Sequence, residues 1–110
     1  MATTYKVLGQ INPAATTATT LYTVPASPTS AVISTITICN QNASAGSFRL
    51  AVRPGGATLN ANHYVSFDTS IAPNDTISLT LGLTLGNTDV ITVYASQANM
   101  SFSAFGCEIS

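Results

Sequence analysis

The sequence contains very little charge. Of its 110 residues, 3 are Lys or Arg and 4 are Asp or Glu, so 6% are charged, where about 25% is usual. Nucleic-acid binding needs a basic stripe that displaces counterions from phosphate, and three cations at a net charge of −1 cannot form one. Electrostatic binding to anionic membranes is excluded for the same reason. A surface so poor in charge favours association with other protein, although a neutral monomer is the alternative.

The sequence also lacks a long hydrophobic run. A membrane-spanning helix needs about 20 mostly apolar residues, and the uncharged stretch 7–48 is interrupted by Thr, Ser, Asn and Pro. The first residues, MATTYKVLGQ, contain no basic region followed by an apolar block, so we expect no secretory signal. The Asn-x-Ser/Thr triplets at Asn42, Asn74 and Asn99 are then expected to be chance matches rather than glycosylation sites.

Cysteine and histidine, the residues that most often bind metals, are scarce. Cys39 and Cys107 belong to no Cys-x-x-Cys pair, and His63 is the single histidine, so we expect no metal site. The cysteines are expected to be small apolar residues within strands, with a disulfide between them as the alternative. His63 lies on an apparent inner strand face, which favours a buried, hydrogen-bonded role over a catalytic one.

The acidic residues form no recognisable catalytic pair. Asp75 and Asp89 follow turn residues, where Asp commonly caps and bends the backbone, and Asp68 ends a predicted strand. The Pro-Gly-Gly sequence at 54–56 lacks the strand, the helix and the lysine of a phosphate-binding loop. We therefore expect neither an enzyme nor a bound cofactor.

Apolar and polar residues alternate along much of the chain. The clearest case is TISLTLGLTL at 76–85, in which one face carries only Ile and Leu and the other carries Thr, Ser and Gly. This period of two predicts a strand with one buried and one polar face. On a helix the same apolar residues would be spread around the whole axis. The predicted inner row is Ile77, Leu79, Leu81, Leu83 and Leu85.

Other segments carry strand patterns as well, at 6–11, 21–24, 31–39, 47–53, 63–68, 89–96 and 100–109. Part of segment 89–96 is apolar on both faces, which is typical of a central strand. The alternation in 100–109 slips at Ala104 and Phe105, which predicts a bulge near Gly106. The predicted inner rows are Val32, Ile36 and Ile38 in 31–39, Phe48, Leu50 and Val52 in 47–53, and His63, Val65 and Phe67 in 63–68.

Turn residues separate these segments at intervals of roughly 10 to 14 residues, and no helical pattern of 10 or more residues appears. The sequence therefore predicts an all-β protein, a single β-sandwich of jelly-roll or immunoglobulin-like topology, with the jelly roll favoured. We divide the chain into an N-terminal strand or extended arm, 1–20, and a sandwich domain, 21–110. The polar segment 12–20 reads equally well as a loop or as an arm.

The segment LYTVPASPTSAVISTITICNQNASAGSFRLAV, residues 21–52, resembles a pattern found in small virion proteins of tailed bacteriophages. The later stretch IAPNDTISLTLGLTLGNTDVITVYAS, residues 71–96, and the closing SFSAFGCEIS are similar to theirs too. The order of these short motifs carries the resemblance, which covers nearly the whole chain. It implies a β-sandwich that is a structural part of the particle and not an enzyme, and it leaves head, tail and fibre open.

The small size, the neutral surface and this resemblance together predict a capsid decoration, or cement, protein. Such a protein would bind the major capsid protein on the head of a virion assembled in the host cytoplasm, as a homotrimer. A tail, baseplate or fibre protein is the alternative, and a carbohydrate-binding module is a third hypothesis, disfavoured by the absence of Trp. Arg49 and Arg53 would serve either as edge protection or in an intersubunit ion pair. The expected partner contacts are Tyr5, Lys6, Leu8, Arg49 and Arg53.

Overall fold

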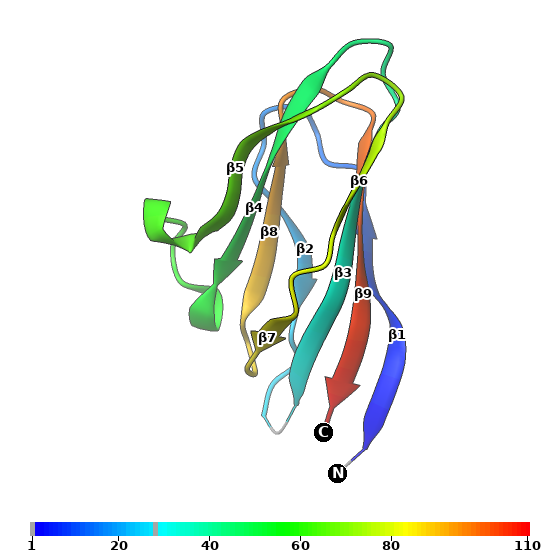
Figure 1. Cartoon of the computed structure of the whole chain (residues 1–110). Coiled ribbons are helices and arrows are strands. Elements are labelled where there is room, and N and C mark those ends of the chain that lie inside the picture. Colours follow the sequence, from blue (N-terminus) through cyan, green and yellow to red (C-terminus); the bar gives the residue numbers. More distant parts are fainter. Residues whose placement is uncertain (1, 28) are drawn as a thin grey trace.

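The computed structural model describes residues 2–27 and 29–110, and strands make up most of this part of the chain (Figure 1). Two short 3-10 turns, η1 (Pro54–Gly56) and η2 (Ala61–His63), lie between β4 and β5. The strands are β1 (Thr3–Ile11), β2 (Thr19–Thr23), β3 (Ser30–Asn40), β4 (Gly46–Arg53), β5 (Tyr64–Ile71), β6 (Thr76–Leu79), β7 (Leu83–Leu85), β8 (Val90–Ala95) and β9 (Met100–Ile109).

The strands form two antiparallel sheets that pack face to face as a β-sandwich (Figure 1). One sheet has the order β1-β9-β3-β6, with β7 also paired to β3, and the other has the order β2-β8-β4-β5. The chain changes sheet at most of its connections, and only β4–β5 and β6–β7 stay within one sheet. This order is that of a jelly roll, so the predicted fold class and the favoured topology are both confirmed.

The core lies between the two sheets and is almost entirely apolar. Phe48 of β4 and Phe102 of β9 meet edge to face within it, with ring centroids 6.3 Å apart. Burial of each such side chain stabilises the fold by about 1.5–3 kcal/mol. Strand β8 is buried on both faces over most of its length and lies between β2 and β4, which confirms the predicted central strand.

The predicted strand at 76–85 is interrupted. β6 ends at Leu79 and β7 begins at Leu83, and between them Gly82 adopts a left-handed conformation with φ of 61°. Gly has no Cβ to oppose this conformation, so the chain turns here. The prediction that Leu81 faces inward is therefore wrong, because this side chain is 41% exposed.

Strand β5 departs most from its predicted orientation. Its pairing with β4 shifts register at two places, between Phe48 and Leu50 and between Leu50 and Ala51. Each extra residue reverses the face to which the following side chains point. The prediction that Val65 and Phe67 face the core is therefore wrong, because they are 45% and 56% exposed.

His63 ends η2 instead of lying within a strand. The predicted burial of this residue is wrong, because its side chain is partly exposed. Its predicted hydrogen bonding is confirmed, since Nδ1 accepts a bond of 3.1 Å from the backbone N–H of Asn60.

The bulge predicted near Gly106 is confirmed in position, but its extra residues belong to the neighbouring strands. β1 shifts register against β9 between Val7 and Gly9, and β3 shifts between Ile33 and Thr35. The shift in β3 places Ile33 in the core, whereas Val32, predicted to face inward, is only partly buried.

The N-terminal residues belong to the sandwich. β1 pairs with β9 from Thr3 to Ile11, and 12–18 connect it to β2. The backbone N–H of Thr16 in this connection donates a bond of 2.8 Å to the carbonyl of Ala95. Because β2 begins at Thr19, the boundary set at residue 20 falls inside a strand, and the division into two parts stays a prediction.

Gly106 permits a close approach of β9 to β3, because a Cβ at this position would overlap the carbonyl oxygen of Val32. Gly106→Ala should therefore lower the free energy of unfolding by about 2–3 kcal/mol, measured by urea denaturation. Gly86→Ala is the matched control, since its added Cβ would meet only the Asp89 carboxylate at 3.7 Å. Equal stability of the two variants would contradict the close-approach requirement.

Candidate partner-contact surfaces

The carboxylates that could serve catalysis are engaged in holding loops. The Asp89 carboxylate accepts bonds of 2.8 Å from the backbone N–H groups of Gly55 and Gly86, and Asp75 accepts one from Thr76. Their predicted turn role is confirmed. Across residues 2–27 and 29–110, no three His, Cys, Asp or Glu side chains gather as metal ligands and no pocket opens. No helix in this part of the chain could cross a membrane.

The two cysteines lie in strands, as predicted, and both are partly exposed free thiols. Cys39 of β3 pairs with Ser101 of β9, six positions along the strand from Cys107. At about 3.4 Å per residue the two thiols are roughly 20 Å apart along the sheet, whereas a disulfide needs Cα atoms within about 7 Å. The strand register therefore excludes the disulfide that was the alternative.

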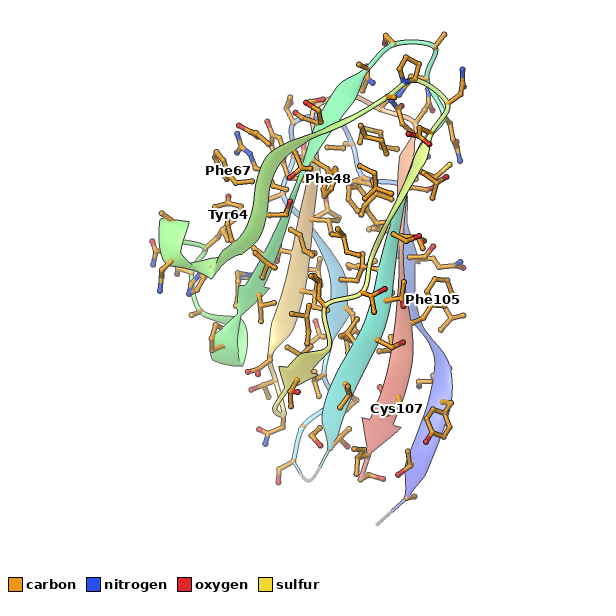
Figure 2. The ribbon with its side chains drawn as sticks, viewed as in Figure 1. Phe48, Tyr64, Phe67, Phe105 and Cys107 are labelled. Atoms are coloured by element: carbon orange, nitrogen blue, oxygen red, sulfur yellow. The ribbon has the colours of Figure 1, made fainter. Side chains whose placement is uncertain are left out.

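One cluster of aromatic and charged side chains lies on the outer face of the β2-β8-β4-β5 sheet. We call it the arginine–aromatic surface and define it as Arg49, Tyr64, Phe67, Asp68 and Tyr94. The Arg49 Cζ lies 4.2 Å from the centroid of the Phe67 ring and 4.3 Å from that of Tyr94, which are favourable cation–π distances. Tyr64 meets Phe67 edge to face at 4.8 Å, and both project away from the opposite sheet (Figure 2).

An ion pair fixes Arg49 in this position. Its Nε donates to Asp68 Oδ1 at 2.6 Å and its Nη2 to Oδ2 at 3.4 Å, and the hydrogen bond to Asp68 raises the pKa of Arg49. Asp68 itself has φ of 50°, a conformation that Asp tolerates better than most residues. A surface ion pair adds little stability by itself, so its main effect here is to hold the side chains in one arrangement.

Arg53 follows Arg49 on β4 but has different partners. Its Nε donates to the Thr92 hydroxyl at 3.0 Å, and Nη1 donates to the carbonyls of Gly56 and Ala57 at 3.5 Å and 3.1 Å. Within the described chain Lys6 and Arg49 form ion pairs, whereas Arg53 is held by neutral groups. It ties the η1 turn to β8, and its role in partner contact stays a prediction.

Lys6 belongs to a polar chain at the rim of the sandwich. Its Nζ lies 2.9 Å from Glu108 Oε1, and the Tyr22 hydroxyl donates to Glu108 Oε2 at 2.5 Å. Burial and the neighbouring Glu108 raise the pKa of Tyr22, while the bonds from Tyr22 and Lys6 lower the pKa of Glu108. These three residues belong to β1, β2 and β9, so the chain joins the two sheets.

A second exposed cluster lies on the outer face of the other sheet. We call it the β1 surface and define it as Tyr5, Val7, Phe105 and Cys107. Tyr5 pairs with Cys107, and Val7 pairs with Phe105, so all four share one face. Tyr5 is 82% and Val7 50% exposed, and Phe105 points away from the sandwich (Figure 2). Leu8 packs against the core instead.

The structure thus separates the predicted contact residues. Arg49 lies in the arginine–aromatic surface with four residues that sequence reasoning missed, and Tyr5 lies in the β1 surface. Lys6 turns toward the rim of the sandwich, and Leu8 turns toward the core. One signal in the sequence could have pointed to Phe67: the adjacent Asp68 is a residue type that tolerates a left-handed backbone.

No protein-family model matches the chain, and no curated protein matches it. Among solved structures, a chain of the Bacillus endospore appendages, described as disulfide-linked pili, superposes with a TM-score of 0.57 at 16% identity, over 98% of this chain and 88% of that one. A chain of infectious bursal disease virus Gt strain gives 0.48 at 12% identity over 96% of this chain, which spans 31% of the viral one. The first of these likenesses supports the fold, and the resemblance to tailed-phage proteins stays a prediction.

Because the pKa of Glu108 is lowered in the folded state, its ion pair and hydrogen bond should contribute stability at neutral pH. The pKa of an unfolded Glu is about 4.3. The contribution is therefore complete above about pH 5, and it is lost as the pH falls through the lower pKa of Glu108 in the folded state. Glu108→Gln should therefore lose less stability than the wild type when thermal unfolding is measured from pH 7 to pH 3. Tyr22→Phe, which removes the largest cause of the shift, should give an intermediate slope. An unchanged slope in Glu108→Gln would contradict this assignment.

Proposed function

We propose that this chain is a structural protein of a tailed-phage particle and decorates its capsid. The observation that carries the proposal is the arginine–aromatic surface, on which Phe67 is turned outward and Arg49 is held between two rings. Phe67 is 56% exposed, and its contacts with Arg49 and Tyr64 leave much of the ring uncovered. Exposure of Phe67 is explained when another protein covers it.

The chemistry of this surface suits a protein partner better than a small molecule. Aromatic residues and Arg are enriched in the contact centres of protein interfaces and carry much of the binding energy. A small ligand usually needs a concave pocket, and none opens in the described residues. Since Arg49 is already fixed by Asp68, little side-chain freedom is lost on binding.

The low charge of the chain supports the same proposal. Burying an unpaired charge in an interface is unfavourable, and both Arg49 and Lys6 have a carboxylate partner within their own chain. Asp68 and Glu108 are those partners, so the arginine–aromatic surface and the rim at Lys6 can each be covered without leaving these charges uncompensated. The Bacillus appendage chain, which has a similar fold, belongs to an assembled pilus, and this too supports a structural, non-enzymatic role.

We place the protein on the virion head, bound to the major capsid protein as a homotrimer and clamping neighbouring capsomers. Many weakly bound copies would together stabilise the shell through multivalency. A tail, baseplate or fibre position remains the alternative. The exposed ring of Phe67 would favour the carbohydrate-binding hypothesis, because sugar sites usually present exposed aromatic rings. However, Arg49 already covers part of the face of this ring.

Removal of the protein from the particle tests the decoration role. Particles assembled without it should lose infectivity at a lower temperature than complete particles, because contacts across capsomer seams are missing. Quantitative gel analysis of purified complete particles should show hundreds of copies. Copy numbers of tens or fewer would move the protein to the tail, and unchanged heat resistance would remove the decoration role.

The surface assignment can be tested separately with Phe67→Ser. This variant should fold normally, because Phe67 contributes no contact to the core, and should bind particles at least tenfold more weakly, as expected for a central interface residue. Leu81→Ser is the matched control, since Leu81 is also an exposed apolar residue but lies away from the arginine–aromatic surface. Affinity for stripped particles is the measurement. Equal binding by the two variants would contradict the assignment.

A further inference from the structure

β1 is the outermost strand of its sheet and pairs on one side only, with β9. Ala2 and Ser110 exchange two backbone hydrogen bonds, of 2.6 Å and 2.8 Å. In an antiparallel ladder such bonded pairs alternate with non-bonded pairs, and the register from Thr3 to Val7 is unbroken. The backbone N–H and C=O groups of Thr3, Tyr5 and Val7 therefore point away from β9, toward the free edge.

The other edges of the two sheets are protected against strand addition. β5 is disrupted by two register shifts, and β6 and β7 are short and separated by the turn at Gly82. β2 has five residues, and a register shift also interrupts its pairing. In the described chain, 3–7 is thus the edge segment that remains regular in its pairing and exposed throughout.

The side chains of 3–7 offer little protection either. Charged residues are the usual guard of a sheet edge, and Lys6 is the only one in this stretch. Its charge is compensated by Glu108 of the same chain at 2.9 Å. Tyr5 and Val7 instead extend the apolar β1 surface up to the edge itself, so a neighbouring strand would cover apolar side chains as it formed backbone bonds.

We propose that β1 pairs with β1 of a second copy of this chain, antiparallel and around a two-fold axis at Tyr5. In this register Tyr5 faces Tyr5 of the other copy, and Thr3 faces Val7. The outward N–H and C=O groups of one copy then meet the same groups of the other, and the two sheets become continuous. Strand addition of this kind is a common mode of protein recognition.

Charge favours a second copy in this register. Lys6 lies opposite Thr4 of the other copy, so no like charges face each other directly, and each Lys6 keeps its own Glu108. A strongly charged partner would find no counter-charge along this edge. A two-fold axis at Lys6 instead would place two ammonium groups opposite each other, which excludes that register, whereas the axis at Tyr5 pairs the whole of 3–7 with the same segment of the other copy.

The contact is small, so the association should be weak. A buried aromatic side chain contributes about 150–250 Å², and two tyrosines with five residues of each strand stay near or below the 1,000 Å² or so of a stable interface. Pairing is therefore expected at high concentration, or on a particle that holds copies close together. This pairing of β1 strands is independent of the proposed attachment to the capsid. It joins two copies, so the proposed homotrimer would need a different contact.

Sedimentation equilibrium between about 10 µM and 1 mM tests the pairing. The weight-average mass should rise from the monomer value of 11.3 kDa toward twice that value. Val7→Lys should remain monomeric, because it replaces an apolar side chain of the contact with a charged one that faces Thr3 of the other copy and has no carboxylate opposite it. Thr37→Lys adds the same charge to the outer face of the central strand β3, away from the edge, and should associate as the wild type does.

Amide hydrogen exchange of the wild-type chain provides a readout without substitution. The amides of Tyr5 and Val7 should exchange more slowly as concentration rises, whereas those of Thr4 and Lys6, already bonded to β9, should not change. A wild type that stays monomeric at 1 mM, a mass approaching three chains, or equal association of Val7→Lys and Thr37→Lys would each overturn the proposal. So would concentration-independent exchange at Tyr5 and Val7. None of these outcomes affects the separate test in which Phe67→Ser is compared with Leu81→Ser for binding to particles.

Discussion

The two sheets can pack only where each strand keeps an apolar row toward the opposite sheet. Phe48 and Phe102, one from each sheet, meet in this contact, and the described core contains almost no polar side chain. Strands have a strict side-chain period of two, so every register shift exchanges inner and outer residues. The outer surfaces of this protein, where its function is proposed to lie, are thus set by the demands of the core and by the places where the period is broken.

Those breaks explain both exposed clusters. The two shifts in β5 turn Phe67 outward, where it packs against Arg49 of the adjacent strand β4, and Arg49 in turn lies over the ring of Tyr94 of β8. The shift in β1 after Val7 directs Leu8 to the core and leaves Tyr5 and Val7 outside. Bulges are known to redirect side chains at sheet edges and beside functional sites. In this chain they leave a sequence with few charges with two different exposed clusters on opposite sheets.

The sequence was sufficient to predict the all-β sandwich, the central strand β8 and the turn role of Asp89, because alternation and turn residues are local signals. It was insufficient for Val32 and Val65, because each lies beside a register shift that depends on the partner strand. The orientation of Leu81 was predicted wrongly because the alternation continues through Gly82. A glycine within a strand pattern does not show from the sequence alone whether it adopts a left-handed conformation. The arginine–aromatic surface brings together residues of three strands, and the alternation pattern does not fix the strand order.

The pairing of Ala2 with Ser110 has a practical consequence. Both ends of the described chain leave the sandwich at the same pole (Figure 1), and neighbouring ends of this kind tolerate circular permutation. A short linker between them would turn β9 and β1 into a hairpin, and new ends could be opened in the loop between β3 and β4. Cargo fused at that loop would then be displayed at the opposite pole, leaving both outer sheet faces uncovered.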